Sequence, residues 1–278
     1  MRVGTNPNRH AKVNGYAPVV VSVITHLPNQ DGYHKQRLEV IKCSLETMRA
    51  NAGHDCQILV WDNGSAPALT HWLKRSYQPD FLVLGDNIGK TSARASIVRL
   101  LPSETIVGVA DDDMFYYPDW LKAHVEVLKT YPNVGTVSGW PVRTQFRFHN
   151  YSTVQWGKKV GTIEAGRFIS EQEDKDFCTS IGRDYKQQVA GTVNDQDVRL
   201  TWRGVQTYAT GHHCQLLGYA GVLAEHCTYS DEAMPTERPF EASLDGAGLL
   251  RLTTYKRYTR HIGNVLDKEL EAKWQKIR

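Results

Sequence analysis

The feature that most constrains the fold of this chain is the alternation of short β-branched runs with helical patterns in its first half. Such runs occur at residues 19–27 (VVVSVITHL), 56–61 (CQILVW), 81–85 (FLVLG) and 105–110 (TIVGVA). Uninterrupted apolar runs of this length are typical of strands that are buried on both faces of a parallel sheet. The pattern therefore predicts an α/β fold, in which a central and mostly parallel sheet is flanked by crossover helices.

The segments between these runs carry helical spacing. Apolar residues recur every three or four positions from Leu38 to Met48, which predicts one helix, and further helices are expected from Gly89 to Leu101 and after Pro118. A fifth strand is expected at residues 133–138. From residue 140 to residue 190 the sequence has no clean helical or strand period. The last element expected is a helix over residues 263–278, with Leu270 and Trp274 on its apolar face.

The composition is that of a globular protein. The 278 residues are 41% hydrophobic, which is enough for a sizeable core in one domain. No run approaches the roughly 20 apolar residues of a membrane span, and the start of the chain has no apolar stretch like that of a signal peptide. We therefore expect a cytoplasmic protein without a transmembrane segment. The five cysteines are scattered and are expected to be reduced.

Charge is distributed unevenly along the chain. The net charge is +3, but Arg2, Arg9 and Lys12 stand near the start without acids, and residues 250–278 hold eight Lys or Arg against three Asp or Glu. Basic ends on an acidic body are compatible with weak contact to a phosphate-rich partner such as nucleic acid. They are equally explained as solvated faces.

The most informative polar motif is the acidic triplet Asp111-Asp112-Asp113, which directly follows a predicted buried strand. Adjacent carboxylates raise the cost of one another's ionisation unless a cation relieves them. Ligands of open α/β sheets bind beyond the carboxyl ends of the strands, where Asp62 is also expected. Oxygen ligands of this kind suit Mg²⁺ or Mn²⁺. The sequence thus predicts a metal site, with a solvated acidic loop as the alternative.

Four motifs in order, VVVSVITHLP, ILVWDNGS, LGDNIGKTSARA and VGVADDDMFYYPDWL, resemble family 2 glycosyltransferases, which have the Rossmann-like GT-A fold. The resemblance implies a single GT-A domain with a nucleotide-sugar-binding half (18–140), an acceptor-binding and catalytic half (141–262) that extends the fold on the acceptor side, and a C-terminal helix (263–278). It also implies a nucleotide-sugar donor, for which a UDP-sugar is favoured, and Mn²⁺ or Mg²⁺ as the metal.

The resemblance assigns roles to individual residues. Asp62 corresponds to the contact with the donor's base, and Asp111 and Asp113 to the contacts with the ribose and the metal-bound diphosphate. The other residues that it places around the donor are Thr25, His26, Asn87, Lys90, Arg94 and Asp112.

A weaker resemblance continues into the second half. Residues 193–200 (VNDQDVRL) look like the family's Glu-Asp-x-Asp segment at the start of a helix, which makes Asp195 the expected catalytic base and Asp197 its rival. A helix start capped by Asp195 is the structural alternative. His226 resembles the late histidine that completes the metal site in many GT-A enzymes, although His212 and His213 compete for that role.

The function implied is metal-dependent transfer of a sugar, with inversion, to a hydroxyl group of a glycan, a lipid-linked acceptor or a small molecule. A fainter similarity to phage glycosyltransferases associated with pyrimidine-oxidising enzymes makes a hydroxymethylated pyrimidine in DNA an alternative acceptor. Two other classes are a nucleotidyltransferase, for which no glycine-rich phosphate loop follows the first strand, and a noncatalytic binding protein. The acids Asp111, Asp113 and Asp195 argue against the latter.

Overall fold

The structure is a computed structural model that describes residues 4, 7, 18–160, 162–232 and 235–278. The basic residues Arg2, Arg9 and Lys12 lie outside the described residues. The strands are β1 Val19–Thr25, β2 Gln57–Asn63, β3 Phe81–Gly85, β4 Ile106–Asp111, β5 Met114–Tyr116, β6 Val134–Ser138, β7 Ile163–Gly166, β8 Asp197–Trp202, β9 Val205–Tyr208, β10 Gln215–Tyr219, β11 Leu250–Thr254 and β12 Thr259–His261.

Helices separate most of these strands. They are α1 Arg37–Ala50, α2 Pro67–Trp72, α3 Lys90–Leu100, α4 Trp120–Thr130, α5 Tyr151–Val160, α6 Glu171–Ser180, α7 Tyr185–Thr192, α8 Ala220–His226, α9 Arg238–Gly246 and α10 Lys268–Gln275, with short non-α turns η1 Gly32–His34, η2 Leu73–Tyr77 and η3 Arg143–Arg147. None of the described helices is long and apolar enough to cross a membrane.

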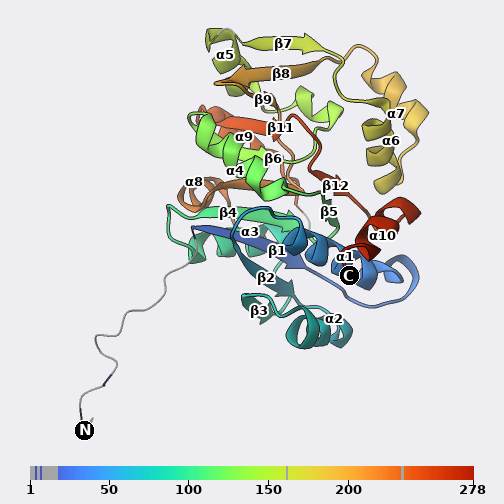
Figure 1. Cartoon of the computed structure of the whole chain (residues 1–278). Coiled ribbons are helices and arrows are strands. Elements are labelled where there is room, and N and C mark those ends of the chain that lie inside the picture. The colour runs from blue at the N-terminus through green and yellow to red at the C-terminus, as the bar shows by residue number, and fades with distance from the viewer. Residues whose placement is uncertain (1–3, 5–6, 8–17, 161, 233–234) are drawn as a thin grey trace.

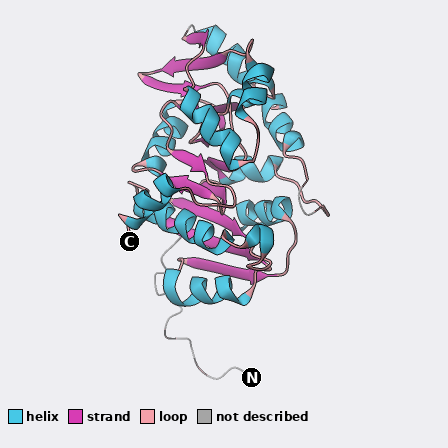
Figure 2. Cartoon of the chain, turned by 90° about the vertical axis from the view of Figure 1, so that its right-hand side faces the viewer, coloured by secondary structure: helices cyan, strands magenta, loops and turns pink. Residues whose placement is uncertain are grey.

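Ten of the strands form one continuous sheet in the order β3-β2-β1-β4-β10-β6-β11-β9-β8-β7 (Figure 1). The strands from β3 to β4 are parallel neighbours, whereas β10 runs antiparallel between β4 and β6. Helices cover both faces of the sheet (Figure 2). Residues of α1 and α4 pack in the larger apolar core, and residues of α3 and α8 pack in the core on the opposite face. The α/β fold with a mixed central sheet flanked by helices is thereby confirmed.

The second half is more regular than its sequence indicates. The expectation of an aperiodic segment at 140–190 is wrong, because α5, β7, α6 and part of α7 lie there. The C-terminal helix is shorter than expected and begins at Lys268, since the Asp267 side chain accepts a hydrogen bond from the Leu270 N–H and caps it. Its apolar face is as expected, with Leu270 and Trp274 buried.

Two features of the topology position the polar side chains at the carboxyl end of β4. The antiparallel return of β10 carries Cys214 beside this strand end, where its carbonyl accepts a hydrogen bond of 2.8 Å from the Asp111 N–H. In addition, β12 pairs with β5 in a separate two-stranded sheet, with His261 opposite Met114. Two segments distant in sequence therefore meet at the acidic triplet.

A buried histidine makes the stability of the fold dependent on pH. His124 of α4 is fully buried, with Nδ1 2.5 Å from the Trp120 carbonyl oxygen and Nε2 3.1 Å from Gln215 Oε1. Burial lowers the pKa of His124 from 6.5 to about 4. The unfolded chain therefore binds this proton below pH 6.5, whereas the folded chain does so only near pH 4, and stability falls as the pH drops through that window.

We predict that the free energy of unfolding drops by roughly 2 kcal/mol more between pH 7 and pH 5 in the wild type than in His124→Gln. The reason is that over this interval His124 gains a proton in the unfolded chain, where its pKa is 6.5, but not in the folded chain, where its pKa is about 4. Urea unfolding at both pH values measures the difference. His71→Gln, at an exposed histidine, is the control for loss of an imidazole. An equal drop in the wild type and His124→Gln would contradict the prediction.

Candidate functional site

The acidic triplet lies at the carboxyl end of β4, as its sequence indicates. Asp111 is the last residue of this strand, and Asp112 and Asp113 form the turn into β5. Asp112 and Asp113 are buried, and Asp112 Oδ2 accepts a hydrogen bond of 3.0 Å from the His26 N–H, just beyond β1. The triplet is thus a built part of the fold and not a solvated acidic loop.

Cations of the chain itself surround the triplet. Lys90, the first residue of α3, places Nζ 2.7 Å and 2.8 Å from the two carboxylate oxygens of Asp111. Arg37, the first residue of α1, donates to Asp112 and, at 2.9 Å, to Asp113. His261 Nε2 lies 3.4 Å from Asp113 Oδ2. The repulsion among the three acids is therefore relieved within the chain, and it is not by itself an argument for a metal ion.

The electrostatics of this cluster follow from burial and pairing. Burial opposes ionisation of Asp113, but His261 and Arg37 hold its pKa well below the usual range. Burial raises the pKa of Asp112, in spite of Arg37. Burial would lower the pKa of His261, yet the Asp113 carboxylate raises it to about 9. Asp113 is thus the acid of this buried pair that is held ionised.

Few side chains near the triplet are placed to bind a divalent cation. Asp113 Oδ1 is buried and has no hydrogen-bond partner among the described residues, and the His261 imidazole borders the same carboxylate. No group of three or more His, Cys, Asp or Glu within the described part of the chain has the arrangement of a metal site. Asp113 and His261 therefore fit an ion such as Mg²⁺ or Mn²⁺ only if a ligand's phosphate oxygens and water complete its coordination.

The structure does not bring His226 to the triplet. His226 ends α8, and its Nδ1 lies 2.7 Å from Ser243 Oγ. The carbonyl oxygen of the next residue, Cys227, accepts a hydrogen bond from Arg99 in the last turn of α3. Arg99 is nine residues from Lys90, which is about 13 Å along the helix axis, so His226 lies near the opposite end of α3 from Lys90. The histidine beside Asp113 is instead His261. Sequence reasoning missed it because only the β5–β12 pairing, which has no local sequence signal, places it there.

The residues expected around a nucleotide form a connected polar network at the strand ends. Thr25 Oγ1 donates a hydrogen bond of 3.0 Å to Asp62 Oδ1, and the Ser65 N–H donates one of 3.1 Å to Asp62 Oδ2. The His26 ring lies 2.9 Å from the Asn63 carbonyl oxygen. Asn87 Oδ1 accepts from Asn63 Nδ2 and from the Gly89 N–H. The residues at the ends of β1 and β2 and at the start of α3 are thus held together.

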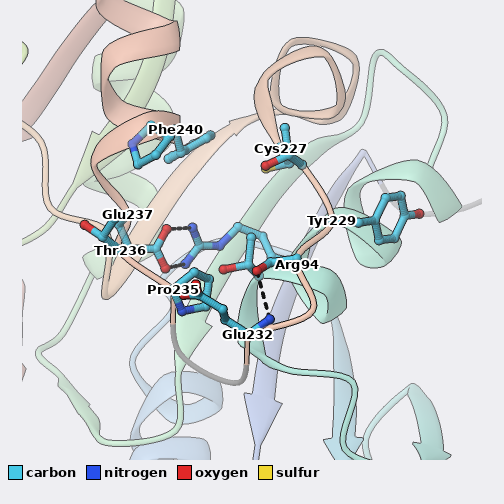
Figure 3. Close-up of a pocket in the computed structure, with 12 residues that line it drawn as sticks. Arg94, Cys227, Tyr229, Glu232, Pro235, Thr236, Glu237 and Phe240 are labelled. Carbon is cyan, nitrogen blue, oxygen red and sulfur yellow. Dashed lines mark hydrogen bonds and ion pairs between the residues drawn. The ribbon is translucent and has the colours of Figure 1, made fainter.

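A carboxylate that sequence reasoning missed lies beside Lys90. Glu237, which precedes α9, places Oε1 3.9 Å from Lys90 Nζ and pairs with both terminal nitrogens of Arg94, at 2.5 Å and 3.0 Å. Figure 3 shows this fork over a pocket of about 280 Å³ that also contacts Cys227 and Phe240. A second cavity, of about 300 Å³, adjoins it through Thr91 and Glu237 and contains Lys90. Because it borders Lys90, for which the sequence predicts a donor contact, we call this second cavity the donor-side cavity.

A further cavity, of about 550 Å³, opens beside His261. Because its lining residues fall in the half of the chain that is expected to bind the acceptor, we call it the acceptor-side cavity. It shares His213 and Arg238 with the donor-side cavity. Buried Glu241 lies 2.7 Å from Arg238 and 3.4 Å from His213 and so orients both side chains. The two cavities are therefore neighbours, with His213 and Arg238 between them.

Asp195 makes no hydrogen bond or ion pair with the triplet. It occupies a turn before β8 and not the start of a helix, so that part of the sequence interpretation is wrong. Its carboxylate pairs with Arg147, at 2.7 Å and 2.9 Å. Its rival, Asp197, is fully buried, pairs with Arg143, and accepts from the Phe168 and Ile169 N–H groups. Asp197 is therefore a structural residue that begins β8.

Proteins similar to this chain are found among solved structures. No curated protein sequence matches the chain. Similar solved structures include the mannosyltransferase PcManGT from Pyrobaculum calidifontis in complex with GDP-Man and Mn²⁺ (20% identity, TM-score 0.36) and TarS 1-349 from S. aureus (12% identity, TM-score 0.49). They match over 50% and 87% of this chain, which spans 42% and 59% of their respective lengths.

The family assignment rests on a separate comparison. The family described as Glycosyl transferase family 2 matches residues 29–188, which is more than half of the chain and contains the acidic triplet, Lys90 and Arg37. The chain belongs to glycosyl transferase family 2.

Proposed function

We propose that this chain transfers a sugar from a nucleotide-diphosphate sugar to a hydroxyl group, by a single displacement that inverts the anomeric carbon. The observation that carries the proposal is the acidic triplet at the end of β4, whose partners Lys90 and His261 line two adjoining cavities, in a chain of this family. Residues 18–140 would bind the donor, residues 141–262 the acceptor, and residues 263–278 would support the fold as the C-terminal segment.

Mn²⁺ or Mg²⁺ is proposed as the cofactor. Asp113 and His261 would hold it, because Asp113 Oδ1 lacks a partner among the described residues and the imidazole is adjacent. The bound ion would supply positive charge to the departing diphosphate. Lys90 and Asp111 would contact the ribose and the diphosphate, and Arg37 would keep Asp112 and Asp113 in place.

For the catalytic base we propose Glu237 in place of Asp195. An inverting displacement needs a carboxylate within hydrogen-bond reach of the acceptor hydroxyl. Glu237 lines the donor-side cavity next to Lys90, whereas Asp195 is paired with Arg147 and lines neither that cavity nor the acceptor-side cavity. The acceptor hydroxyl would enter from the acceptor-side cavity past His213. The candidates to test are a glycan, a lipid-linked acceptor, a small molecule and a hydroxymethylated base in DNA.

The proposal is tested with the full chain and a panel of UDP-, GDP- and TDP-sugars, with UDP-sugars first. A donor that binds only the folded state raises the melting temperature, so one nucleotide of the panel should do so more strongly with Mn²⁺ than without it. The same donor should be hydrolysed slowly when no acceptor is present. Neither stabilisation nor hydrolysis with any donor would overturn the proposed function.

Asp62→Ala is expected to weaken donor binding, with a smaller effect on turnover at saturating donor, because recognition of the base is remote from the reacting carbon. Asp62 is buried and accepts hydrogen bonds from Thr25 and Ser65, so the melting temperature should also fall. Calorimetric titration of the donor below the melting temperature separates the two effects. Unchanged donor affinity would remove Asp62 from the nucleotide site.

A further inference from the structure

The acceptor-side cavity continues outward into a second, more open groove. This groove measures about 460 Å³ and lies between η3 and the segment from Gly182 to Thr192, which includes α7. It shares Thr144, Arg147 and Arg183 with the acceptor-side cavity. We call it the outer groove. A path therefore leads from His261 and His213 past Arg147 and Arg183 to the surface.

The charged side chains along this path are mostly cationic. Besides the histidines they are Arg147, Arg183 and Arg238, and the only acid that lines either cavity among the described residues is Asp184. Asp184 is already engaged, because its Oδ1 accepts a hydrogen bond of 2.8 Å from the Gln187 N–H and caps α7. The lining of the two cavities therefore presents three guanidinium groups to an anion. Its one carboxylate among the described residues, that of Asp184, is already hydrogen-bonded to the backbone.

The three arginines differ in what already binds them. Arg238 donates Nη1 to Glu241 and Gln145, and its guanidinium lies over the Phe148 ring, 3.7 Å from the centroid. Arg147 uses Nε and Nη2 on Asp195 and the Gly191 carbonyl, which leaves Nη1 without a partner in the described part of the chain. Arg183 is exposed, and its side chain has no hydrogen bond or ion pair with any described residue.

This pattern distinguishes a ligand site from a network of internal ion pairs. Asp195 and Glu241 pair with Arg147 and Arg238, and each arginine keeps N–H groups that have no partner among the described residues. Arg183 is a full positive charge at the point where the two cavities join. The planar fork of a guanidinium matches the oxygens of a phosphate group and binds them through charge-assisted hydrogen bonds.

We propose that the outer groove is an anion subsite, and that it takes a phosphodiester of an acceptor chain whose reacting hydroxyl lies in the acceptor-side cavity. Arg183 is its principal ligand, and Arg147 supplies the second cation. The proposal rests on the proposed function, since it defines the acceptor class of the same site. Arginines line both cavities along the path. A phosphodiester chain, which carries several negative charges in a row, matches them better than a single carboxylate does.

The experiment measures binding to the full chain by fluorescence anisotropy without donor. The probes are a short fluorescein-labelled oligothymidylate, its methylphosphonate analogue with uncharged linkages, a labelled poly(ribitol phosphate) and a labelled neutral maltooligosaccharide. At least one phosphodiester probe should bind roughly tenfold more tightly than the uncharged probes, and Arg183→Gln should weaken that binding by roughly tenfold or more, the size expected for a hydrogen bond to a charged group. Binding should also weaken as salt is raised.

Arg75→Gln is the matched control, because Arg75 is also exposed but lies in η2, outside the residues of both cavities. It should bind the probes like the wild type. Preference for the oligothymidylate or for the poly(ribitol phosphate) identifies the source of the phosphodiester. Equal binding of charged and uncharged probes, or equal binding by Arg183→Gln and the wild type, overturns the proposal. Donor hydrolysis by the wild type is scored separately, so a failure of the proposed function is seen independently.

Discussion

Asp113→Asn should reduce sugar transfer by roughly 10³-fold or more, because the substitution removes the negative charge that would hold a divalent cation beside the leaving diphosphate. Stabilisation of that charge by a metal contributes several kcal/mol, and each 1.36 kcal/mol is about tenfold in rate. The exchange keeps the size of the side chain and its reach to Arg37 and His261. The measurements are initial rates over a range of Mn²⁺ concentrations and Mn²⁺ binding by electron paramagnetic resonance.

The control is Asp55→Asn, which removes an exposed carboxylate outside the site. It should match the wild type in rate and in Mn²⁺ binding. If Asp113→Asn kept the wild-type rate and Mn²⁺ affinity, Asp113 would not be a metal ligand and the cation site would have to be sought elsewhere.

Glu237→Gln should lower turnover by about 10²–10⁴-fold, the usual contribution of a positioned general base. The glutamine keeps an oxygen for the pairing with Arg94, so donor affinity should change much less than turnover. Rates at saturating donor and metal, together with calorimetric donor affinity, separate the two quantities.

Asp195→Asn is the matched comparison, because it neutralises the other candidate base and leaves Glu237 untouched. Asp195 is paired with Arg147 and lines neither the donor-side nor the acceptor-side cavity, so the variant should turn over within a few-fold of the wild type. The reverse result, with Asp195→Asn inactive and Glu237→Gln active, would identify Asp195 as the base and would require the acceptor to enter by the Arg147 side.

The sequence predicted the parts of the fold whose signals are local. The strands β1 to β4 coincide with uninterrupted apolar runs, and Asp111 ends one of them, so both the sheet and the position of the triplet could be predicted. Helices α5 and α6 were missed because they carry few apolar residues on a recognisable face. The buried residues of α5 are Thr153 and Gly157. Those of α6 are Asp174, Asp176 and Cys178.

The partners of the triplet could not be predicted, because tertiary contacts alone bring them together. Arg37 and Lys90 begin two different helices, and His261 arrives through the β5–β12 pairing. A single sequence gives no reason to prefer His261 over His226, although only the former lies beside Asp113. The helix start expected at Asp195 was wrong for a related reason, since Asp197 is buried against Arg143 and begins a strand where the local pattern resembles a helix start.

The continuity of the ten-stranded sheet limits how the molecule can move. Strands β10 and β11, from the second half of the chain, are hydrogen-bonded to β4 and β6 of the first half, so no flexible hinge separates the two halves. Rigid-body closure of one lobe over another, common in two-domain enzymes, is therefore not available to this fold. Exclusion of water during a reaction must come from side chains and short connecting segments. If the outer groove binds the acceptor as proposed, an engineer could exchange the η3–α7 region to change the acceptor while leaving the donor side in place.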